Sequence, residues 1–368
     1  MQQSRRAGHQ RLEMVRPYNK SMLRVVLVVA VAAFFSGCIS VKNERGTPTL
    51  LKTEEASLAF LRSEVDRFAR VDSLRAKMDL KFEDNSFAQF GSKEVYRSAD
   101  GEVVVQRPAS IYLKVQVPVL KTDVAQMTSD GEKFRVAVLQ DGGSGKYKKF
   151  VMGTNNADYT KLQREIDLAN GDGTIRQNVN AFANLRPQHF TDAMLVRPTG
   201  GDYVYSMSST FLIEEDQKQT KKSPLRIVNR GYYLLDEFGR NPDGGLQIVR
   251  RFWFDRVGGI RLARQQIFDS RGEIESDIVY GREGKLTETP DFTNLPLEIV
   301  VTRPKEKYSM RLTYQVPEKV MIGHQFPQEA FVLQNSWNLE VVDLDKMLRE
   351  NNTGAMPPRP GSEASRLQ

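Results

Sequence analysis

Apolar and polar residues alternate with a period of two through much of the chain after Ser73, which predicts β-strands. Met78, Leu80 and Phe82 alternate with charged residues. Short turn sequences separate the alternating segments, and strands joined by such turns form hairpins and an antiparallel sheet. The predicted strands are 77–83, 93–97, 102–106, 111–117, 134–138, 203–213, 225–235, 246–255, 260–269, 273–280, 297–302 and 307–315.

A helical period comes before the first strand and predicts a helix that packs on the sheet. Its apolar stripe is Leu58, Leu61, Val65 and Phe68. Its other face carries acids and bases together rather than a basic excess, which favours packing on a sheet over lying on a membrane. We expect Glu54 and Glu55 in its first turn, and further helices at 159–166 and 175–185. The fold class is therefore α+β.

The strongest apolar run lies near the N-terminus, at Val25–Phe35, and it is followed by Ser36, Gly37 and Cys38. Six basic residues and one acid precede it. A basic segment, a short apolar segment and small residues together form a secretory signal. The cysteine after the small pair resembles the lipobox of bacterial lipoproteins. That resemblance implies a diacylglyceryl thioether on Cys38, cleavage just before it and acylation of the new N-terminus, for example by palmitate.

Other interpretations of this segment fit less well. A membrane-spanning helix needs about 20 apolar residues, and this run is shorter. A buried helix of a soluble domain normally has a polar face, which this run lacks. Phe35 stands where the lipobox prefers leucine, and Met22 is an alternative start because Arg24 still supplies a basic residue.

Removal of the leader changes the charge of the chain. The formal charge is +7, of which residues 1–37 contribute +5, so about +2 remains. The positive net charge lies mainly in the leader, so it does not indicate nucleic-acid binding by the rest of the chain. Cys38 is also the only cysteine, which excludes a disulfide within the chain.

The composition divides the chain into four parts. Residues 1–37 form the signal peptide, and 38–53 form a polar tether with Gly46 and Pro48. Residues 54–348 form the folded domain. Residues 349–368 are rich in proline and polar residues, and we expect them to be disordered.

The folded part has a characteristic order of motifs. The N-terminal helix is followed by Gly101–Pro108, which leads into Ile111–Val117. Much later Tyr232–Leu235 precedes Arg251–Asp255, the Asp269–Gly272 turn and Pro296–Ile299. This order resembles that of the LolA/LolB-like envelope proteins, which carry and receive lipoproteins in Gram-negative bacteria. The resemblance covers about residues 54–345, and its motifs are specific as an ordered set.

This resemblance implies a strongly curved antiparallel sheet, an incomplete barrel, whose concave apolar face is covered by helices and holds acyl chains. The cargo would be a lipid or an acylated lipoprotein, with no cofactor. Ile39 and Ser40 follow the cysteine, where aspartate would retain a lipoprotein at the inner membrane, so we expect an outer-membrane anchor facing the periplasm. The candidate cavity residues are Phe252, Phe254, Ile260, Leu262, Met310, Leu312 and Tyr314, each of which is also typical of ordinary core packing.

Two other classes of function remain open. One is a structural or assembly lipoprotein that uses the sheet as a scaffold for other envelope proteins. The other is a hydrolase that uses His189 or His324, which would need a carboxylate or serine nearby. The sequence favours a protein that is not an enzyme, since His189 lies in a turn-like context and Gly142–Lys146 departs from the phosphate-binding loop pattern.

Overall fold

The computed structural model describes residues 47–84, 94–95, 99–118, 120–140, 145, 148–157, 159, 187–216, 219–287 and 292–352. The chain divides into two units, Met1–Thr47 and Pro48–Gln368, and every helix and strand named below lies in the second. Cys38, Gly142–Ser144, the predicted helices after residue 159 and the end of the tail lie outside the described residues. No helix in the described part of the chain is long and apolar enough to cross a membrane.

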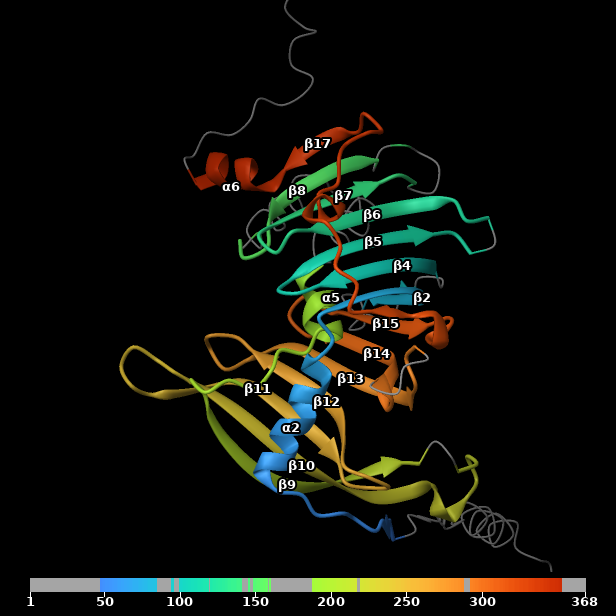
Figure 1. Ribbon diagram of the computed structural model, residues 1–368, viewed down its shortest axis with the longest axis vertical. Coiled ribbons are helices and arrows are strands. Elements are labelled where there is room, and N and C mark those ends of the chain that lie inside the picture. The colour runs from blue at the N-terminus through green and yellow to red at the C-terminus, as the bar shows by residue number, and fades with distance from the viewer. Residues whose placement is uncertain are drawn as a thin grey trace, which may run out of the picture. The chain divides into compact units, whose positions relative to one another are not determined.

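One large sheet of 17 strands forms the body of the second unit. Its long strands follow the order β9, β10, β11, β12, β13, β14, β15, β2, β4, β5, β6, β7, β8, β17 (Figure 1). The strands are β1 Thr49–Leu50, β2 Ser73–Asp84, β3 Glu94–Val95, β4 Ala99–Gln106, β5 Ser110–Gln116, β6 Asp123–Ser129, β7 Lys133–Val138, β8 Lys149–Thr154, β9 Val204–Glu215, β10 Ile227–Arg240, β11 Leu246–Asp255, β12 Arg261–Phe268, β13 Ile274–Gly284, β14 Leu295–Arg303, β15 Tyr308–Tyr314, β16 Met321–Ile322 and β17 Glu340–Asp343.

Most of the predicted strands are present, but β1, β6, β8, β16 and β17 were not predicted, and the sheet differs in its overall form. Consecutive hairpins are antiparallel as expected, but β1 pairs in parallel with β10 and β17 pairs in parallel with β8, so the sheet is mixed. The expected incomplete barrel is wrong, because the sheet is open and is not strongly curled. The physical reason is that the end of the chain pairs with β8 instead of closing the sheet against β9.

The two halves of the sheet are joined at β2, which pairs mainly with β15 and, over two residues, with β16. Residues 78–84 of β2 lie antiparallel to residues 308–314 of β15, with Leu80 opposite Leu312. Residues directly opposite one another in neighbouring strands share a face of the sheet. The pairing therefore makes one continuous face from the inward residues of both halves.

We call this apolar side, which carries Leu80, Val103 and Phe252, the helix face. The other side is the charged face, and ion pairs cross between its neighbouring strands. They include Asp236 with Arg251, Arg264 with Asp277, Glu298 with Arg311 and Glu102 with Arg75. Exposed pairs of this kind add little stability, so they mark the solvated side of the sheet.

The α-helices in the described part of the chain are α2 (Leu58–Ala69), α5 (Pro187–Met194) and α6 (Leu344–Asn352). Leu61, Val65 and Phe68 of α2 are buried as predicted. The expected start at Glu54 and Glu55 is wrong, because the Ser57 hydroxyl accepts a hydrogen bond from the Phe60 amide (3.2 Å) and caps the helix there. The stretch predicted as a tether contains β1.

A strap of residues 323–339 connects β16 to β17 across the charged face of the N-terminal half, in front of β4–β7 in Figure 1. The Phe326 amide donates to the Gln106 side chain (2.7 Å), and the Leu333 amide donates to the Thr128 hydroxyl (3.0 Å). Phe331, in the short helix η5 (Gln328–Phe331), is fully buried. The strap therefore gives the N-terminal half a second covered face.

We predict that Phe331→Ala lowers the free energy of unfolding by about 3–5 kcal/mol, because it leaves a cavity under the strap. Chemical denaturation followed by circular dichroism measures the change. Trp337→Ala, at a 38% exposed position of the same strap, is the matched control and should cost much less. Equal losses for the two variants would contradict the anchoring role of Phe331.

Candidate functional site

The candidate cavity residues all lie on or beside the helix face. Phe252 and Phe254 come from β11, with Leu262 of β12 directly opposite Phe254. Met310, Leu312 and Tyr314 come from β15 and are buried. Ile260 precedes β12 and is half-buried against the same core. Trp253 lies between the two phenylalanines on the charged face, where its indole nitrogen donates to Gln266 (3.0 Å).

The structure places these candidates in two groups rather than one. Three strands, β12, β13 and β14, separate β11 from β15, which corresponds to about 19 Å across the sheet. Ile278 and Tyr280 of β13, with Ile299 of β14, fill the apolar surface between the groups. The role of the candidates as the lining of a ligand cavity stays a prediction.

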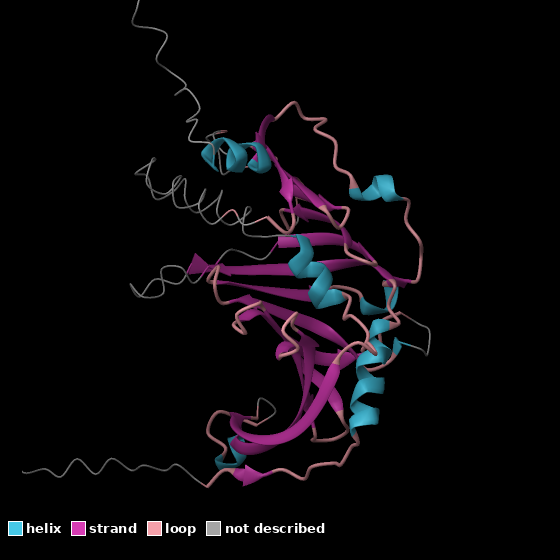
Figure 2. Ribbon diagram, turned by 90° about the vertical axis from the view of Figure 1, so that its left-hand side faces the viewer, coloured by secondary structure: helices cyan, strands magenta, loops and turns pink. Residues whose placement is uncertain are grey.

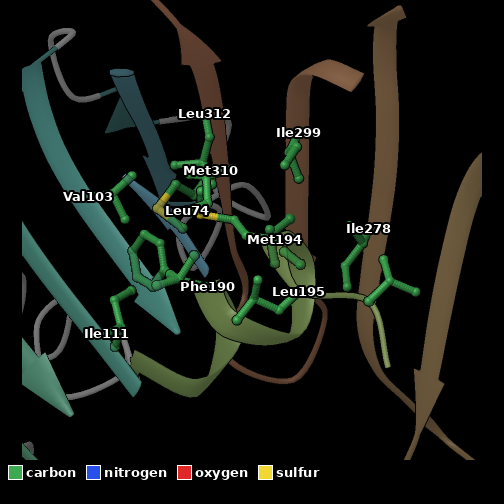
Figure 3. Packing of buried hydrophobic residues seen from close by; sticks show 14 of the residues in the cluster. Leu74, Val103, Ile111, Phe190, Met194, Leu195, Ile278, Ile299, Met310 and Leu312 are labelled. Carbon is green, nitrogen blue, oxygen red and sulfur yellow. The ribbon is translucent and has the colours of Figure 1, made fainter. Parts of the chain in front are cut away.

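Two helices cover this apolar surface. Phe68 of α2 packs against Tyr280, with ring centroids 5.9 Å apart. Figure 2 shows the helices lying against the strands. Figure 3 shows the side chains of α5 and the residue after it among those of the strands on both sides of the β2–β15 junction. The labelled side chains are Phe190, Met194 and Leu195, packed near Leu74, Val103, Ile111, Ile278, Ile299, Met310 and Leu312.

Polar contacts join the covering elements to one another. The Asp66 carboxylate on α2 accepts hydrogen bonds from the Thr199 amide (2.7 Å) and hydroxyl (3.0 Å). Arg107, between β4 and β5, donates to Ala69 O (3.0 Å) at the end of α2 and to Val196 O (2.7 Å) after α5. We call α2, α5 and residues 195–200 together the lid, because these bonds connect them into one unit.

A buried ion pair closes one margin of the covered surface. Arg250 of β11 and Glu237 of β10 form two bonds of 2.7 and 2.6 Å, and both side chains are almost fully buried. Arg250 also donates to the carbonyls of Arg197 (2.8 Å) and Pro198 (3.0 Å) in the lid. Tyr205 donates to Glu237 (2.8 Å), and burial together with this carboxylate raises the pKa of Tyr205 to about 12.

A second charged cluster holds the ends of β10, β11 and β12. Asp255 accepts from Arg230 (2.7 Å), Arg261 (2.6 Å) and the Val257 amide (2.9 Å). Burial by itself raises the pKa of the Asp255 carboxyl, but the hydrogen bonds from the two guanidinium groups outweigh it and hold that pKa below its ordinary value.

The rings of both histidines considered for a hydrolase lie against aromatic side chains. His189 is not in a turn, as its sequence context indicated, but is buried in α5, where its Nδ1 lies 2.6 Å from the Tyr308 hydroxyl. The His324 ring packs on Phe326, with centroids 4.7 Å apart. Among the described residues, no group of three or more histidine, cysteine, aspartate or glutamate side chains is arranged to hold a metal ion.

Sequence reasoning missed α5 and the polar groups that hold the lid. Pro187 at the first helical position, followed by Phe190, Ala193 and Met194 on one face, is a signal from which α5 could have been predicted. Arg107 and Arg250 donate to lid carbonyls that lie 38 to 89 residues away along the chain, and no local pattern indicates such contacts. Glu237 is closer, since it lies opposite Arg250 in the same hairpin, 13 residues away.

No protein-family model matches this chain, and no curated protein sequence matches it either. Its fold is similar to that of several solved structures. One is a LolA superfamily protein from Nitrosomonas europaea, with 11% identity, a TM-score of 0.37 and coverage of 76% of this chain and 99% of that one. Another is an outer membrane lipoprotein-sorting protein domain from Vibrio parahaemolyticus, with 9% identity, a TM-score of 0.35 and coverage of 75% and 95%.

A third is a DUF1329 family protein from Desulfovibrio piger, with 10% identity, a TM-score of 0.36 and coverage of 76% and 97%. These matches are all at 9–11% identity and at TM-scores of 0.35–0.37. The likeness gives no residue of this chain a role.

We predict that Arg107→Gln loosens the lid, because the carbonyls of Ala69 and Val196 lose a shared charged donor. Hydrogen exchange of the α2 amides should become faster, while exchange in β11–β13 changes little. Arg75→Gln is the matched control, since Arg75 pairs with Glu102 on the charged face. Unchanged exchange in α2 would contradict the role given to Arg107.

We predict that the stability contributed by Asp255 depends on pH. A carboxyl whose pKa is lower in the folded than in the unfolded state stabilises the fold above its unfolded pKa, and this contribution is lost as the pH falls through the folded value. The difference in unfolding free energy between wild type and Asp255→Asn should therefore be larger at about pH 6 than at about pH 2.5. Denaturant titrations at both pH values measure it, and a constant difference would contradict the assignment.

Proposed function

We propose that this protein binds an acyl chain, carried by a lipid or by an acylated lipoprotein, between the lid and the helix face. The observation that supports this most is the character of the contact between them. Leu61, Val65 and Phe68 of α2 face buried apolar side chains of the sheet. An acyl chain inserted there replaces one apolar contact with another, and each buried methylene contributes about 0.8 kcal/mol.

The polar bonds of the lid suit a cover that moves as a unit. Asp66 and Arg107 connect its parts to one another and to the β4–β5 turn. The lid also bonds to the C-terminal strands. Arg250 donates to the carbonyls of Arg197 and Pro198, Tyr280 donates to the carbonyl of Ala193, and the Gly200 amide donates to the Tyr205 hydroxyl. Arg67 donates to the Thr293 carbonyl, and His189 contacts the Tyr308 hydroxyl. Separating the lid from these strands would break these bonds but would leave the strand pairs of the sheet intact.

The cellular part of the proposal comes from the N-terminal sequence. Acylation of Cys38 would fix the domain to the outer membrane on its periplasmic side, next to the acylated molecules that it would bind. Phe252, Phe254, Ile260, Leu262, Met310, Leu312 and Tyr314 would contact the acyl chain. The role is that of a carrier or receptor in the sorting of lipoproteins or lipids, without catalysis.

The test uses two adjacent residues of β13 that lie on opposite faces. Ile278 is fully buried on the helix face, and Val279 is 43% exposed on the charged face. We predict that Ile278→Ala shifts binding towards longer fatty acids and that Ile278→Trp shifts it towards shorter ones. Displacement of a fluorescent fatty acid by chains of increasing length measures the preference, and native mass spectrometry detects the bound lipid.

The same substitutions at Val279 are the control and should leave the preferred length unchanged. Unfolding curves of every variant separate lost binding from lost folding, because a larger core residue costs about 1–3 kcal/mol. The proposal is wrong if the folded wild-type protein binds no acyl chain. That result would favour the scaffold function instead.

A further inference from the structure

An apolar patch lies at the end of the sheet where the described chain begins. Its members are Leu50, Phe211, Ile213 and Leu225, which are 67%, 47%, 69% and 56% exposed. Asn229 of β10 pairs with Ile213 on one side and with Leu50 on the other, so these two side chains share a face of the sheet. Leu225 belongs to the short helix η2 (Pro224–Arg226) in the β9–β10 connection.

The backbone is shaped to keep Phe211 on this surface. Phe211 lies opposite Gly231, and a Cβ atom at Gly231 would come within 2.6 Å of Thr53 Cγ2 and 3.0 Å of the Phe211 ring. The absent side chain therefore leaves room for the segment after β1 and for the aromatic ring together. Large apolar side chains grouped in this way on a surface mark a contact site.

The charges around the patch favour an anionic lipid surface as its partner. Lys52, Lys221 and Lys222 are exposed at the same end of the sheet. Of the acids at the end of β9, Glu215 pairs with Arg226 (2.6 Å). Glu214 keeps its charge but is half-buried, where it accepts a hydrogen bond from Tyr232 (2.9 Å). A lysine near an anionic membrane contributes about 1 kcal/mol to binding.

The length of the N-terminal segment supports the same partner. Thr49 of β1 is the eleventh residue after Cys38, so this end of the domain lies within about 40 Å of that cysteine even if the segment is fully extended. Leu50, the residue after Thr49, belongs to the patch. A lipid anchor on Cys38 would therefore keep the patch close to the membrane.

We infer that Leu50, Phe211, Ile213 and Leu225 insert into the surface of the membrane that holds the protein, with the three lysines on its anionic headgroups. This inference rests on the proposed acylation of Cys38. It adds a second membrane contact, which sets the orientation of the domain: the β9 end of the sheet faces the bilayer, and the helix face near it opens towards the lipid.

The experiment places an environment-sensitive nitrobenzoxadiazole label at Ile213→Cys or Leu225→Cys in the full chain. The purified protein is reconstituted in vesicles of phosphatidylethanolamine and phosphatidylglycerol. Val279→Cys, another exposed apolar strand position, is the matched control. Lipids with a spin label on the acyl chain should quench the labels at 213 and 225 by at least about twofold, and the label at 279 much less.

Two results would overturn the inference. One is equal quenching at positions 213 and 279. The other is shielding of the label at position 213 from water in the absence of lipid, if that shielding increases with protein concentration. This result would assign the patch to a contact with a second copy of the chain.

Absence of acylation at Cys38 can be detected separately, by labelling of the wild-type chain. The wild-type chain takes up label only if Cys38 is not acylated, and the comparison of positions 213 and 279 can then be repeated in Cys38→Ser. Fatty-acid binding under the lid is measured separately and does not depend on the patch. The two proposals can therefore fail independently.

Discussion

The pairing of β2 with β15 is the contact on which the rest of this structure depends. It joins strands that are more than 220 residues apart in sequence and places Leu80 beside Leu312. Without it, the hairpins of each half would form separate sheets, each with an apolar face too small for the lid. The entropy of closing so long a loop grows only slowly with its length, so a pair of well-matched strands is enough to hold the halves together.

A continuous apolar face must be shielded from water, and the two faces of this sheet are covered by different parts of the chain. On the helix face, α2 and α5 bury apolar side chains and are connected through Arg107 and Asp66. On the charged face of the N-terminal half, the strap runs to β17, which pairs with β8. β17 thereby replaces β8 at the edge of the sheet, and an edge strand of only four residues offers little backbone for a further strand to pair with.

The sequence predicted local features well and distant ones poorly. The bounds of β11 agree with the alternating pattern at 246–255, and Trp253 faces away from its neighbours Phe252 and Phe254 as a period of two requires. The parallel pairing of β17, the open form of the sheet and the burial of His189 were not predicted. Each depends on contacts between segments that are distant in sequence, and a local pattern of residues does not indicate such contacts. The candidate site followed the same rule: the face was predicted, but the separation of its two groups was not.

Opening the lid costs free energy, and a ligand that binds to the helix face must offset that cost. Lifting α2 removes Leu61, Val65 and Phe68 from their contacts, and exposing each such side chain to water costs about 1.5–3 kcal/mol. Under the proposed function, an acyl chain would offset the cost for these three side chains at about 0.8 kcal/mol for each methylene that it buries, so roughly 6 to 11 methylenes would balance α2 alone. Movement of α5 with α2 would raise that number. The packing of the closed lid would therefore favour long acyl chains over short ones, through the same apolar contacts that stabilise the fold.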